Sequence, residues 1–452
     1  MKKVITYGSF DLFHKGHLKL IERAKDLGDY LIVGITTEHY DKTRGKININ
    51  DSLITRIENI QKTGLADEII IEHFDGQKIE DILKYKIDIF VVGSDWKGQF
   101  EHLKEYCEVV YLERTKGISS SQIRESSKRI IKLGIIGTGR IANRFIDEVK
   151  YVSGIHIESV YNPRFSSAEA FGINHSLRVY TDDLDIFLKD IDAVYIASPV
   201  NTHYEYTKIC LNMNKHIICE KPFVLKKEEA IELFGIANSK GLILMEAIKT
   251  AYCTGFNNLI NIVKNDKIGQ VIDIEACFTK LVSGDIRELD PNQNGGSVTE
   301  LASYTLLPII KILGTNFENI TATTFKNDDN VDVYTKINIE YKSQIATSKT
   351  GLSVKSDGHL LISGTKGYIF VEAPWWKTES FEVRYENIAD NEKYFFKYMG
   401  DGLRYELSEF INLINSGEGN SKNYKLQEKE IIALAEIFEI FLKGDRCKVL
   451  KF

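Results

Sequence analysis

Two histidines near the start of the chain have the type and spacing to act on a phosphate. Residues 10–17 read FDLFHKGH, so His14 and His17 stand three apart where an apolar strand at 4–7 is expected to turn into a helix. Backbone N–H groups at a helix start attract a polyphosphate, and imidazoles can donate hydrogen bonds to charge that builds at a phosphorus atom. Histidines in a turn also serve as caps or surface residues, so this pattern alone leaves both interpretations open.

A second anion-binding pattern follows further along the chain. Residues 114–124 read RTKGISSSQIR, which combines cations, a glycine turn and a run of hydroxyl groups in front of an expected helix. Hydroxyl side chains cap a helix start, and an arginine binds phosphate oxygens strongly. A plainly capped helix start is the alternative interpretation.

A third pattern is typical of dinucleotide binding. Residues 133–142 read LGIIGTGRIA, an apolar strand followed by GxGxxA at a helix start, where backbone amides can reach a pyrophosphate. About twenty residues further on, where an acidic residue would bind the ribose of NAD, the chain has Asn162 and Arg164. A neutral side chain beside an arginine favours the 2′-phosphate of NADP over a bare ribose, whereas a solvated loop charge is the alternative for Arg164.

The elements that would position these residues form an α/β chain of several domains. The 452 residues are enough for two or three cores. Two segments begin with an apolar strand, a glycine turn and a helix, at 4–8 and at 130–137, and the polar stretch 126–129 between them is short. We therefore predict a small doubly wound domain at 1–128, a nucleotide-binding domain at 130–250, and a domain with a mixed or antiparallel sheet and packing helices at 251–452.

Composition and charge exclude several function classes. Lys and Arg number 58 against 64 Asp and Glu, a net charge of −6 that argues against a general binder of nucleic acid or anionic membranes. No apolar run reaches the roughly eighteen residues of a membrane helix, and the start is too short for a signal peptide. The 6 cysteines are far apart, which indicates neither a side-chain metal site nor a disulfide framework, and we expect a cytoplasmic location.

Four segments in the first 128 residues together closely resemble the glycerol-3-phosphate cytidylyltransferases of teichoic-acid synthesis: 7–11, 14–17, 93–96 and 114–121. The resemblance implies an HxGH-type nucleotidyltransferase with a Rossmann-like fold. It implies transfer of CMP from CTP to a polyol phosphate by direct attack, with Mg²⁺ held mainly by the triphosphate and with His14 and His17 stabilising the transition state. The implied CTP contacts are Gly8, Ser9, Phe10, Asp95, Trp96, Arg114, Thr115, Gly117, Ile118, Ser119, Ser120 and Ser121.

The same resemblance places cations around the phosphates and the acceptor, namely Arg44, Lys46, Arg56 and Lys78. Two departures leave the acceptor open. Gly64 precedes Asp67 and Glu68 where the family tends to carry a further arginine, and one residue is inserted after Lys46.

Segments 193–203, 215–222, 295–304 and 402–406, together with the GxGxxA turn, resemble the glucose-fructose oxidoreductase, inositol dehydrogenase and MocA family across residues 131–452. In that family Lys221 would lie near the nicotinamide, Glu300 would bind substrate, and Tyr304, one helical turn from Glu300, would donate the proton. Glu300 and Ala302 depart from the usual Asp and Gly, which leaves substrate size open. The implied cofactor contacts are Gly137, Thr138, Gly139, Arg140, Ile141, Asn162, Arg164, Ser198, Pro199, Asn201, His203, Glu220 and Lys221.

Together the two resemblances predict consecutive steps. NADP(H), favoured over NAD(H), would reduce a sugar phosphate to a polyol phosphate, and CTP would then activate that product as CDP-glycerol, CDP-ribitol or CDP-arabinitol, or CDP-mannitol for capsule or teichoic-acid assembly. The alternative is a cytidylyltransferase whose second domain is inactive and serves as a nucleotide-sensing or assembly module. An RNA-binding protein is disfavoured because no basic stripe with interleaved aromatics appears. Both families suggest a homodimer with small-molecule partners.

Overall fold

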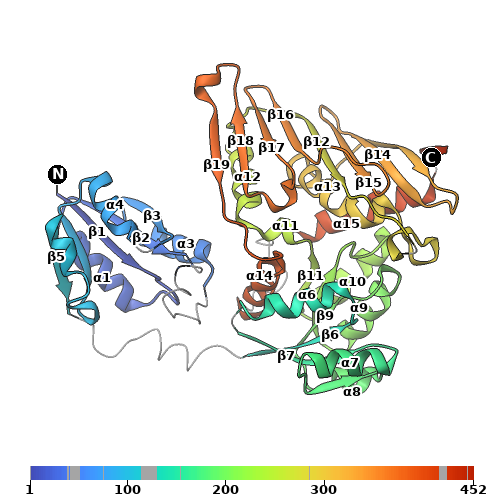
Figure 1. Ribbon diagram of the computed structural model, residues 1–452, viewed down its shortest axis with the longest axis horizontal. Coiled ribbons are helices and arrows are strands. Elements are labelled where there is room, and N and C mark those ends of the chain that lie inside the picture. The colour runs from blue at the N-terminus through green and yellow to red at the C-terminus, as the bar shows by residue number, and fades with distance from the viewer. Residues whose placement is uncertain are drawn as a thin grey trace. The chain divides into compact units, whose positions relative to one another are not determined.

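A computed structural model describes residues 2–37, 40, 51–74, 76–113, 130–152, 154–284, 286–416, 425–444 and 446–451. The chain forms two compact units, residues 1–129 and 130–452 (Figure 1). No helix in the described ranges is long and apolar enough to cross a membrane.

The first unit is built on a five-stranded parallel sheet with strand order β3-β2-β1-β4-β5. Side chains of successive strand residues point to opposite faces, so Val4 and Val33 enter one core while Ile5 and Ile32 enter the other. This burial on both faces explains the continuous apolar runs of the sequence. The strands are β1 (Lys3–Gly8), β2 (Tyr30–Thr36), β3 (Glu68–Glu72), β4 (Ile89–Gly93) and β5 (Glu108–Leu112).

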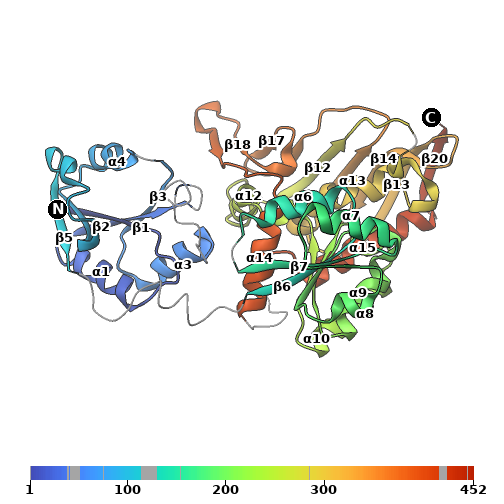
Figure 2. The same ribbon diagram turned by 60° about the horizontal axis from the view of Figure 1, so that its bottom comes forward.

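Helices cover both faces of this sheet. Figure 2 shows α1 and α3 on one face and α4 on the other, and Ile21, Ile60 and Ile82 are their buried contacts with the two cores. The strand order reverses between β1 and β4, so the connections on either side of this point cross opposite faces of the sheet. Open parallel sheets bind ligands at such a point. The helical elements are α1 (Lys15–Lys25), α3 (Leu53–Thr63), α4 (Gln77–Tyr85), η1 (Ser94–Trp96) and η2 (Glu101–Glu105).

The second unit begins with a six-stranded parallel sheet of order β11-β10-β9-β6-β7-β8. Its strands are β6 (Ile131–Ile136), β7 (Ile155–Tyr161), β8 (Val179–Thr181), β9 (Ala193–Ile196), β10 (His216–Glu220) and β11 (Leu244–Ala247). The connecting helices are α6 (Arg140–Val149), α7 (Phe165–Asn174), α8 (Leu184–Leu188), η3 (Val200–Thr202), α9 (His203–Asn212) and α10 (Lys227–Ser239). The strand order reverses between β6 and β9. The GxGxxA turn directly follows β6, so it lies at this point of the sheet.

A nine-stranded mixed sheet of order β19-β18-β17-β16-β12-β15-β14-β13-β20 completes the second unit and confirms the predicted fold class. Most neighbours are antiparallel, and β12/β15 and β13/β20 are parallel. The long helix α13 (Ser297–Leu313) packs against β12, β14 and β15. The strands are β12 (Val271–Thr279), β13 (Asn319–Lys326), β14 (Asp332–Glu340), β15 (Ile345–Gly351), β16 (Leu360–Gly364), β17 (Tyr368–Val371), β18 (Ser380–Arg384), β19 (Glu392–Phe395) and β20 (Cys447–Lys451).

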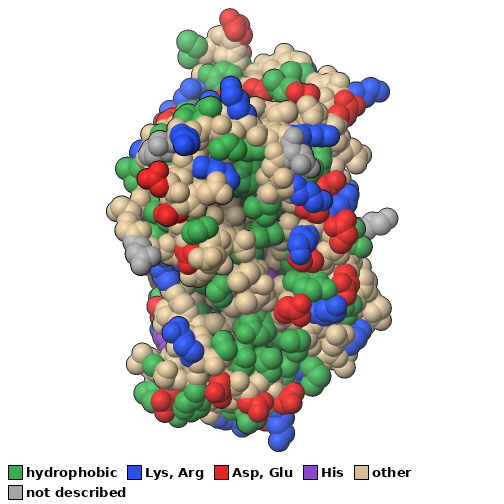
Figure 3. Space-filling model, turned by 90° about the vertical axis from the view of Figure 1, so that its right-hand side faces the viewer, with side chains coloured by type: hydrophobic (Ala, Val, Ile, Leu, Met, Phe, Trp, Pro, Cys, Tyr) green, Lys and Arg blue, Asp and Glu red, His purple; other side chains and the backbone are tan. Residues whose placement is uncertain are grey.

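Further helices complete this unit. They are α11 (Lys249–Tyr252), α12 (Thr254–Lys264), α14 (Leu403–Ser416) and α15 (Glu428–Lys443), with the short turns η4 (Arg287–Leu289), η5 (Pro291–Gln293), η6 (Trp375–Lys377) and η7 (Ile388–Asp390). On the face shown in Figure 3, Lys and Arg lie among Asp and Glu, with no extended region of one sign.

A buried ion pair connects α14 to α6 within the second unit. The Arg404 guanidinium donates to both carboxylate oxygens of Glu148, at 2.8 and 2.6 Å, and the backbone N–H groups of Asp401 and Arg404 also point to this carboxylate. Because both side chains are nearly buried, removing one leaves the other charge without compensation.

We therefore expect Glu148→Ala to lower the free energy of unfolding of the second unit by about 3 kcal/mol. The measurement is urea unfolding of the full chain in a Trp96→Phe background, in which the fluorescence comes from Trp375 and Trp376 of this unit. Asp147→Ala is the matched control on the same helix, because Asp147 pairs with Lys150 at an exposed position and should cause no measurable change. Equal losses in the two variants would contradict the prediction.

Candidate active sites

The turn between β1 and α1 has an unusual backbone that buried polar contacts hold in place. Phe10 and Leu12 both adopt φ 50, in the left-handed region that residues with a side chain rarely occupy. The Asp11 carboxylate accepts a hydrogen bond from the backbone of Asp51 at 2.8 Å, and the Asp51 carboxylate accepts one from the backbone of Leu12 at 2.8 Å. This reciprocal pair fixes the loop that leads to the two histidines.

Arg56, on α3, fixes the same loop through hydrogen bonds to backbone carbonyl groups. Its side chain is 0 % exposed, and Nη1 donates to the carbonyl oxygens of Ser9 and Thr36 at 2.8 Å each, while Nε donates to the carbonyl of Asp51 at 3.1 Å. The structure thus gives Arg56 a stabilising role that the sequence did not indicate. Its expected contact with the acceptor stays a prediction.

The two histidines of the motif lie side by side. His14 is the N-cap of α1, where its Nδ1 accepts a hydrogen bond from the backbone of Gly16 at 3.0 Å. Its ring stacks on that of His17 with 3.9 Å between centroids and 19° between planes. With Nδ1 of His14 accepting, the neutral ring carries its proton on Nε2 and can donate to an anion. The backbone amides of the first turn of α1 and the two imidazoles therefore lie together at the start of the helix, where an anion could bind.

A pocket opens at the carboxyl ends of β1, β2, β3 and β4 in the first unit. Four of the residues that line it were predicted for this site, namely Gly8, Ser9, Lys78 and Trp96. The other six are Tyr7, Thr36, Glu72, Phe90, Val92 and Phe100. Lys78 forms a close ion pair with Glu72, and its ammonium lies 4.9 Å from the ring centroid of Tyr7 and 5.5 Å from that of Phe100. A cation among aromatic rings and one carboxylate is suited to a planar, anionic ligand.

Tyr7 anchors the inner wall of this pocket. Its hydroxyl donates to Asp81 at 2.9 Å, and Gln77 donates to the same carboxylate at 3.1 Å. Burial, with the neighbouring Asp81, raises the pKa of Tyr7, so its hydroxyl keeps its proton. Asp95 is described only through the backbone of η1, and nine predicted contacts lie outside the described residues: Arg44, Lys46, Arg114, Thr115, Gly117, Ile118, Ser119, Ser120 and Ser121.

The glycine turn after β6 has the shape that a pyrophosphate needs. Gly137 has φ +104, and a side chain there would lie 2.6 Å from the carbonyl oxygen of Ala197. Gly139, the N-cap of α6, has nothing within 4 Å of the position its side chain would take, so a ligand can approach the helix start. Arg140 and Ile141 form the first turn of α6, and Arg140 donates to Glu288 at 3.0 Å.

Asn162 and Arg164 stand at the end of β7, beside this turn. Asn162 donates through its amide to the hydroxyl of Thr138 at 2.9 Å and accepts from the backbone of Arg164 at 2.9 Å. Arg164 is exposed and is the N-cap of α7, which leaves its guanidinium directed to solvent. The residues expected at the adenosine ribose are therefore connected to the glycine turn.

His203 holds two loops of the cofactor side together. Its Nδ1 lies 2.9 Å from the carbonyl oxygen of Pro222, and its Nε2 lies 2.9 Å from that of Ser198. Burial lowers the pKa of His203, so the ring is neutral and its single N–H donates to one of these two carbonyl oxygens. Asn201 lies exposed in η3 after Pro199, while His203 is 1 % exposed. His203 therefore positions the two loops, and its direct contact with a cofactor stays a prediction.

The Lys221 loop is braced from the neighbouring strand. Glu246, on β11, accepts a hydrogen bond from the backbone of Phe223 at 2.9 Å, and burial raises its pKa to about 8. Glu220 accepts from the Tyr195 hydroxyl at 2.6 Å and from the backbone of Lys221 at 3.3 Å. The backbone on both sides of Lys221 is thus held by buried carboxyl groups.

Lys221, Glu300 and Tyr304 come together from segments far apart in the sequence. The Lys221 ammonium donates to the backbone carbonyl of Glu300 at 3.0 Å and lies 5.9 Å from the ring centroid of Tyr304. Helix α13 carries both partners, and it begins at Ser297 because Gly296 has φ 144 and because the Asp332 carboxylate accepts from the backbone of Val298 at 2.9 Å. The long helix therefore points its first turn at Lys221.

The surroundings of Glu300 and Tyr304 contain residues that the sequence did not single out. The Glu300 carboxylate pairs with Arg287 of η4 at 2.8 Å. The Tyr304 ring lies 5.5 Å from that of Phe278, which stacks on Trp376 with 3.6 Å between centroids and 7° between planes. Burial raises the pKa of Tyr304 well above its usual range, so its hydroxyl is protonated and can donate. The adjacent tryptophans Trp375 and Trp376 are the sequence feature that could have pointed to this aromatic contact.

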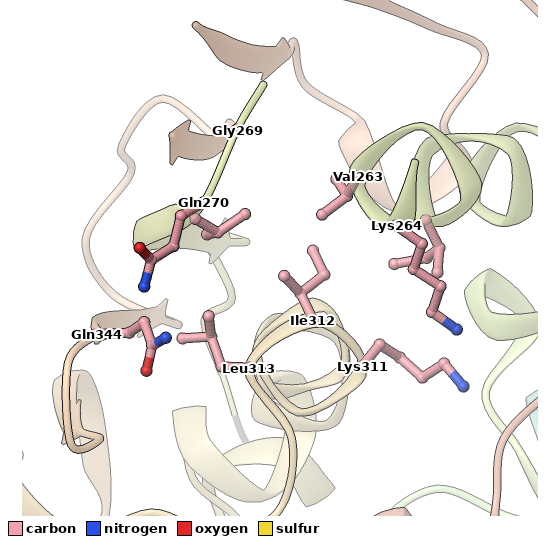
Figure 4. Close-up of a pocket in the computed structure, with 10 residues that line it drawn as sticks. Val263, Lys264, Gly269, Gln270, Lys311, Ile312, Leu313 and Gln344 are labelled. Atoms are coloured by element: carbon pink, nitrogen blue, oxygen red, sulfur yellow. The ribbon is translucent and has the colours of Figure 1, made fainter. Parts of the chain in front are cut away.

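A further pocket of the second unit contains no predicted site residue. Figure 4 shows the amides of Gln270 and Gln344 on one side and the ammonium groups of Lys264 and Lys311 on the other, over an apolar floor that includes Ile312. Lys311 already donates to Glu430 at 3.0 Å. In the described ranges no cluster of His, Cys, Asp and Glu could hold a metal ion.

Comparison with known proteins separates the chain at the same place. The family model of cytidylyltransferase-like proteins matches residues 5–126, and the GFO_IDH_MocA model, an oxidoreductase family with an NAD-binding Rossmann fold, matches residues 131–248. The glycerol-3-phosphate cytidylyltransferase of Bacillus spizizenii is 55% identical over 125 residues, which are 28% of this chain and 96% of that protein.

The second unit has more distant relatives. The scyllo-inositol 2-dehydrogenase (NADP(+)) IolU of Bacillus subtilis is 27% identical over 325 residues, 69% of this chain and 95% of that protein. The 3-ketoreductase KijD10 of Actinomadura kijaniata, solved with NADP and TDP-benzene, superposes with a TM-score of 0.64 at 18% identity, over 71% of this chain and 99% of that one. The chain thus joins two enzyme domains: through its first unit it belongs to the cytidylyltransferase-like family, and its second unit matches the GFO_IDH_MocA model of oxidoreductases with an NAD-binding Rossmann fold.

Proposed function

We propose that this chain makes a CDP-polyol in two steps. The second unit reduces the carbonyl group of a sugar phosphate to give a polyol phosphate, and the first unit transfers CMP from CTP to that phosphate with release of pyrophosphate. The observation that carries the proposal is that one chain holds both an assembled Lys221–Tyr304 site and a stacked His14–His17 pair at a helix start. The cytidylyltransferase relatives act on a polyol phosphate, which is what a sugar phosphate becomes on reduction.

In the reduction, Lys221 and Tyr304 act at the carbonyl oxygen. The nicotinamide, when bound, supplies the hydride for the carbonyl carbon. The ammonium of Lys221 polarises the carbonyl, and the protonated hydroxyl of Tyr304 delivers a proton to the oxygen as negative charge develops there. The Phe278–Trp376 stack offers an apolar surface to the C–H face of a sugar.

NADP(H) is the cofactor we infer. Gly139 leaves room for its pyrophosphate, and Arg164 is available for the 2′-phosphate because its side chain is exposed. IolU uses NADP(+) by its name, and KijD10 was solved with NADP, which supports the same choice.

In the transfer step, the first unit acts through positioning and charge. The backbone amides of α1 and the imidazoles of His14 and His17 stabilise the charge that builds as the acceptor phosphate attacks the α-phosphorus and pyrophosphate leaves. Mg²⁺ would be bound mainly by the triphosphate. Lys78, which is paired with Glu72, lies among the rings of the neighbouring pocket.

The proposal is tested by incubating the full chain with NADPH and a panel of aldose and ketose phosphates, then adding CTP. We expect loss of NADPH absorbance with one member and pyrophosphate release only after CTP is added. If no panel member oxidises NADPH while supplied polyol phosphates still release pyrophosphate, the two-step proposal is wrong and the second unit is inactive as a reductase toward these compounds.

Separate substitutions should separate the two activities. We expect His17→Ala to lower pyrophosphate release by at least about 100-fold and to leave NADPH oxidation unchanged, because charge stabilisation at the phosphorus is lost. Lys221→Ala should do the reverse, with a loss of about 100-fold or more in NADPH oxidation. The exposed residues His102 and Lys189 are matched controls, and His102→Ala and Lys189→Ala should leave both rates unchanged. A variant that loses both activities would contradict independent sites.

Cofactor choice should depend on Arg164. We expect Arg164→Ala to raise the KM for NADPH about tenfold and to leave the KM for NADH unchanged, since only NADPH carries the phosphate that the guanidinium would bind. Steady-state kinetics with both cofactors measure this. Arg446→Ala is the control, because Arg446 is exposed and donates to Asn319 in the other sheet of this unit. Equal changes for NADPH and NADH would refute the role.

A further inference from the structure

One buried carboxyl group beside the reductase site has no role in the steps above. Glu406 lies in the first turn of α14, and its side chain is 0 % exposed. Neither of its carboxyl oxygens has a hydrogen-bond partner among the residues that the structure describes. Burying an ionised carboxylate without a partner is very unfavourable, so such a group either finds a cation or keeps its proton.

Every charged or titratable neighbour of Glu406 already has another partner or is an aromatic hydroxyl. Lys249 of α11 donates to the carbonyl of Asp401 at 2.7 Å, and Tyr398 donates to the same carbonyl at 3.2 Å. Tyr195 of β9 donates to Glu220. The groups that act on Glu406 electrostatically, or that it acts on, are Glu148, Tyr195, Glu220, Lys249, Tyr304 and Tyr398.

Glu220 and Glu406 form a pair of buried acids, and the hydrogen bonds decide which one is charged. Glu220 accepts from the Tyr195 hydroxyl and from the backbone of Lys221, which stabilises its carboxylate, whereas Glu406 accepts no such bond. Burial, followed by the nearby Glu220, raises the pKa of Glu406 well above its usual range. The proton of the pair therefore resides on Glu406.

We propose that Glu406 is a positioning residue of the reductase site, which by staying protonated leaves Glu220 as the one charged member of the buried acid pair that faces Lys221 and Lys249. Net positive charge favours the alkoxide character that develops on the carbonyl oxygen during reduction. If Glu406 lost its proton, the added negative charge would repel that oxygen and make Tyr304 and Lys221 weaker acids. This role rests on the proposed reduction, whereas the protonation of Glu406 does not.

Infrared spectroscopy of the full chain tests the protonation directly. A protonated carboxyl group has a carbonyl stretch that a carboxylate lacks, so at pH 7 we expect Glu406→Gln to lose part of this band. Glu430→Gln is the matched control, because Glu430 is a buried glutamate whose carboxylate pairs with Lys311 at 3.0 Å and should contribute nothing to the band. A band that is identical in the wild type and in Glu406→Gln overturns the proposal. If Glu406→Gln fails to fold, the band is followed against pH in Glu246→Gln, because Glu246 is another buried glutamate whose raised pKa of about 8 would keep a signal at pH 7. Loss of all protonated carboxyl signal below pH 7 in that variant overturns the proposal.

The pH dependence of NADPH oxidation tests the effect on the reaction. In the wild type, kcat/KM should fall at alkaline pH as Glu406 ionises, and in Glu406→Gln this fall should move up by about one pH unit because no charge can form there. Glu430→Gln should follow the wild type. Coincident profiles of the wild type and Glu406→Gln would overturn the electrostatic role. If no carbonyl compound oxidises NADPH, the proposed reduction fails, and the infrared result still decides whether Glu406 is protonated.

Discussion

Parallel pairing of strands is the constraint on which both sites depend. In a parallel sheet all carboxyl ends lie at one edge, so loops that are distant in sequence meet there. In the first unit this edge collects residues after β1, β2, β3 and β4 around Lys78. In the second unit it brings the glycine turn after β6 beside the loop after β9, so closely that a side chain on Gly137 would lie 2.6 Å from Ala197. Each site begins at the turn after the first strand of its unit, which leads directly into a helix start.

Buried polar groups fix the loops and helices near each of these edges. Burying such a group lowers the stability of the fold unless the group is paired. Arg56 satisfies three carbonyl groups, Glu72 pairs with Lys78, and Glu148 accepts a bidentate bond from Arg404. Removing one partner of such a set leaves a charge without compensation in a poorly solvated interior. Glu406 is the exception among these buried groups, because in our proposal its charge is neutralised by a proton and not by a cationic partner.

The sequence was sufficient for the parts of the molecule that have a local pattern. Apolar runs with glycine turns gave the two parallel sheets and the start of each site, and the four-residue spacing of Glu300 and Tyr304 placed both on one helix that does reach Lys221. It was insufficient where a side chain finds its partner across the fold. The contact of Tyr7 with Asp81 and the pair of Arg287 with Glu300 depend on tertiary packing, which no spacing in the chain encodes. Arg56 shows the same limit, since a cation in a helix pattern does not reveal that its partners are backbone carbonyls.

The two proposed reactions are compatible because neither consumes the group that the other needs. Reduction at Lys221 and Tyr304 changes a carbonyl carbon and leaves the phosphate ester intact, so the phosphate can serve as the nucleophile in the first unit. Transfer at His14 and His17 forms a bond at that phosphate and leaves the new hydroxyl group unchanged. In the proposed order reduction comes first, because only the reduced product is the polyol phosphate that the first unit activates.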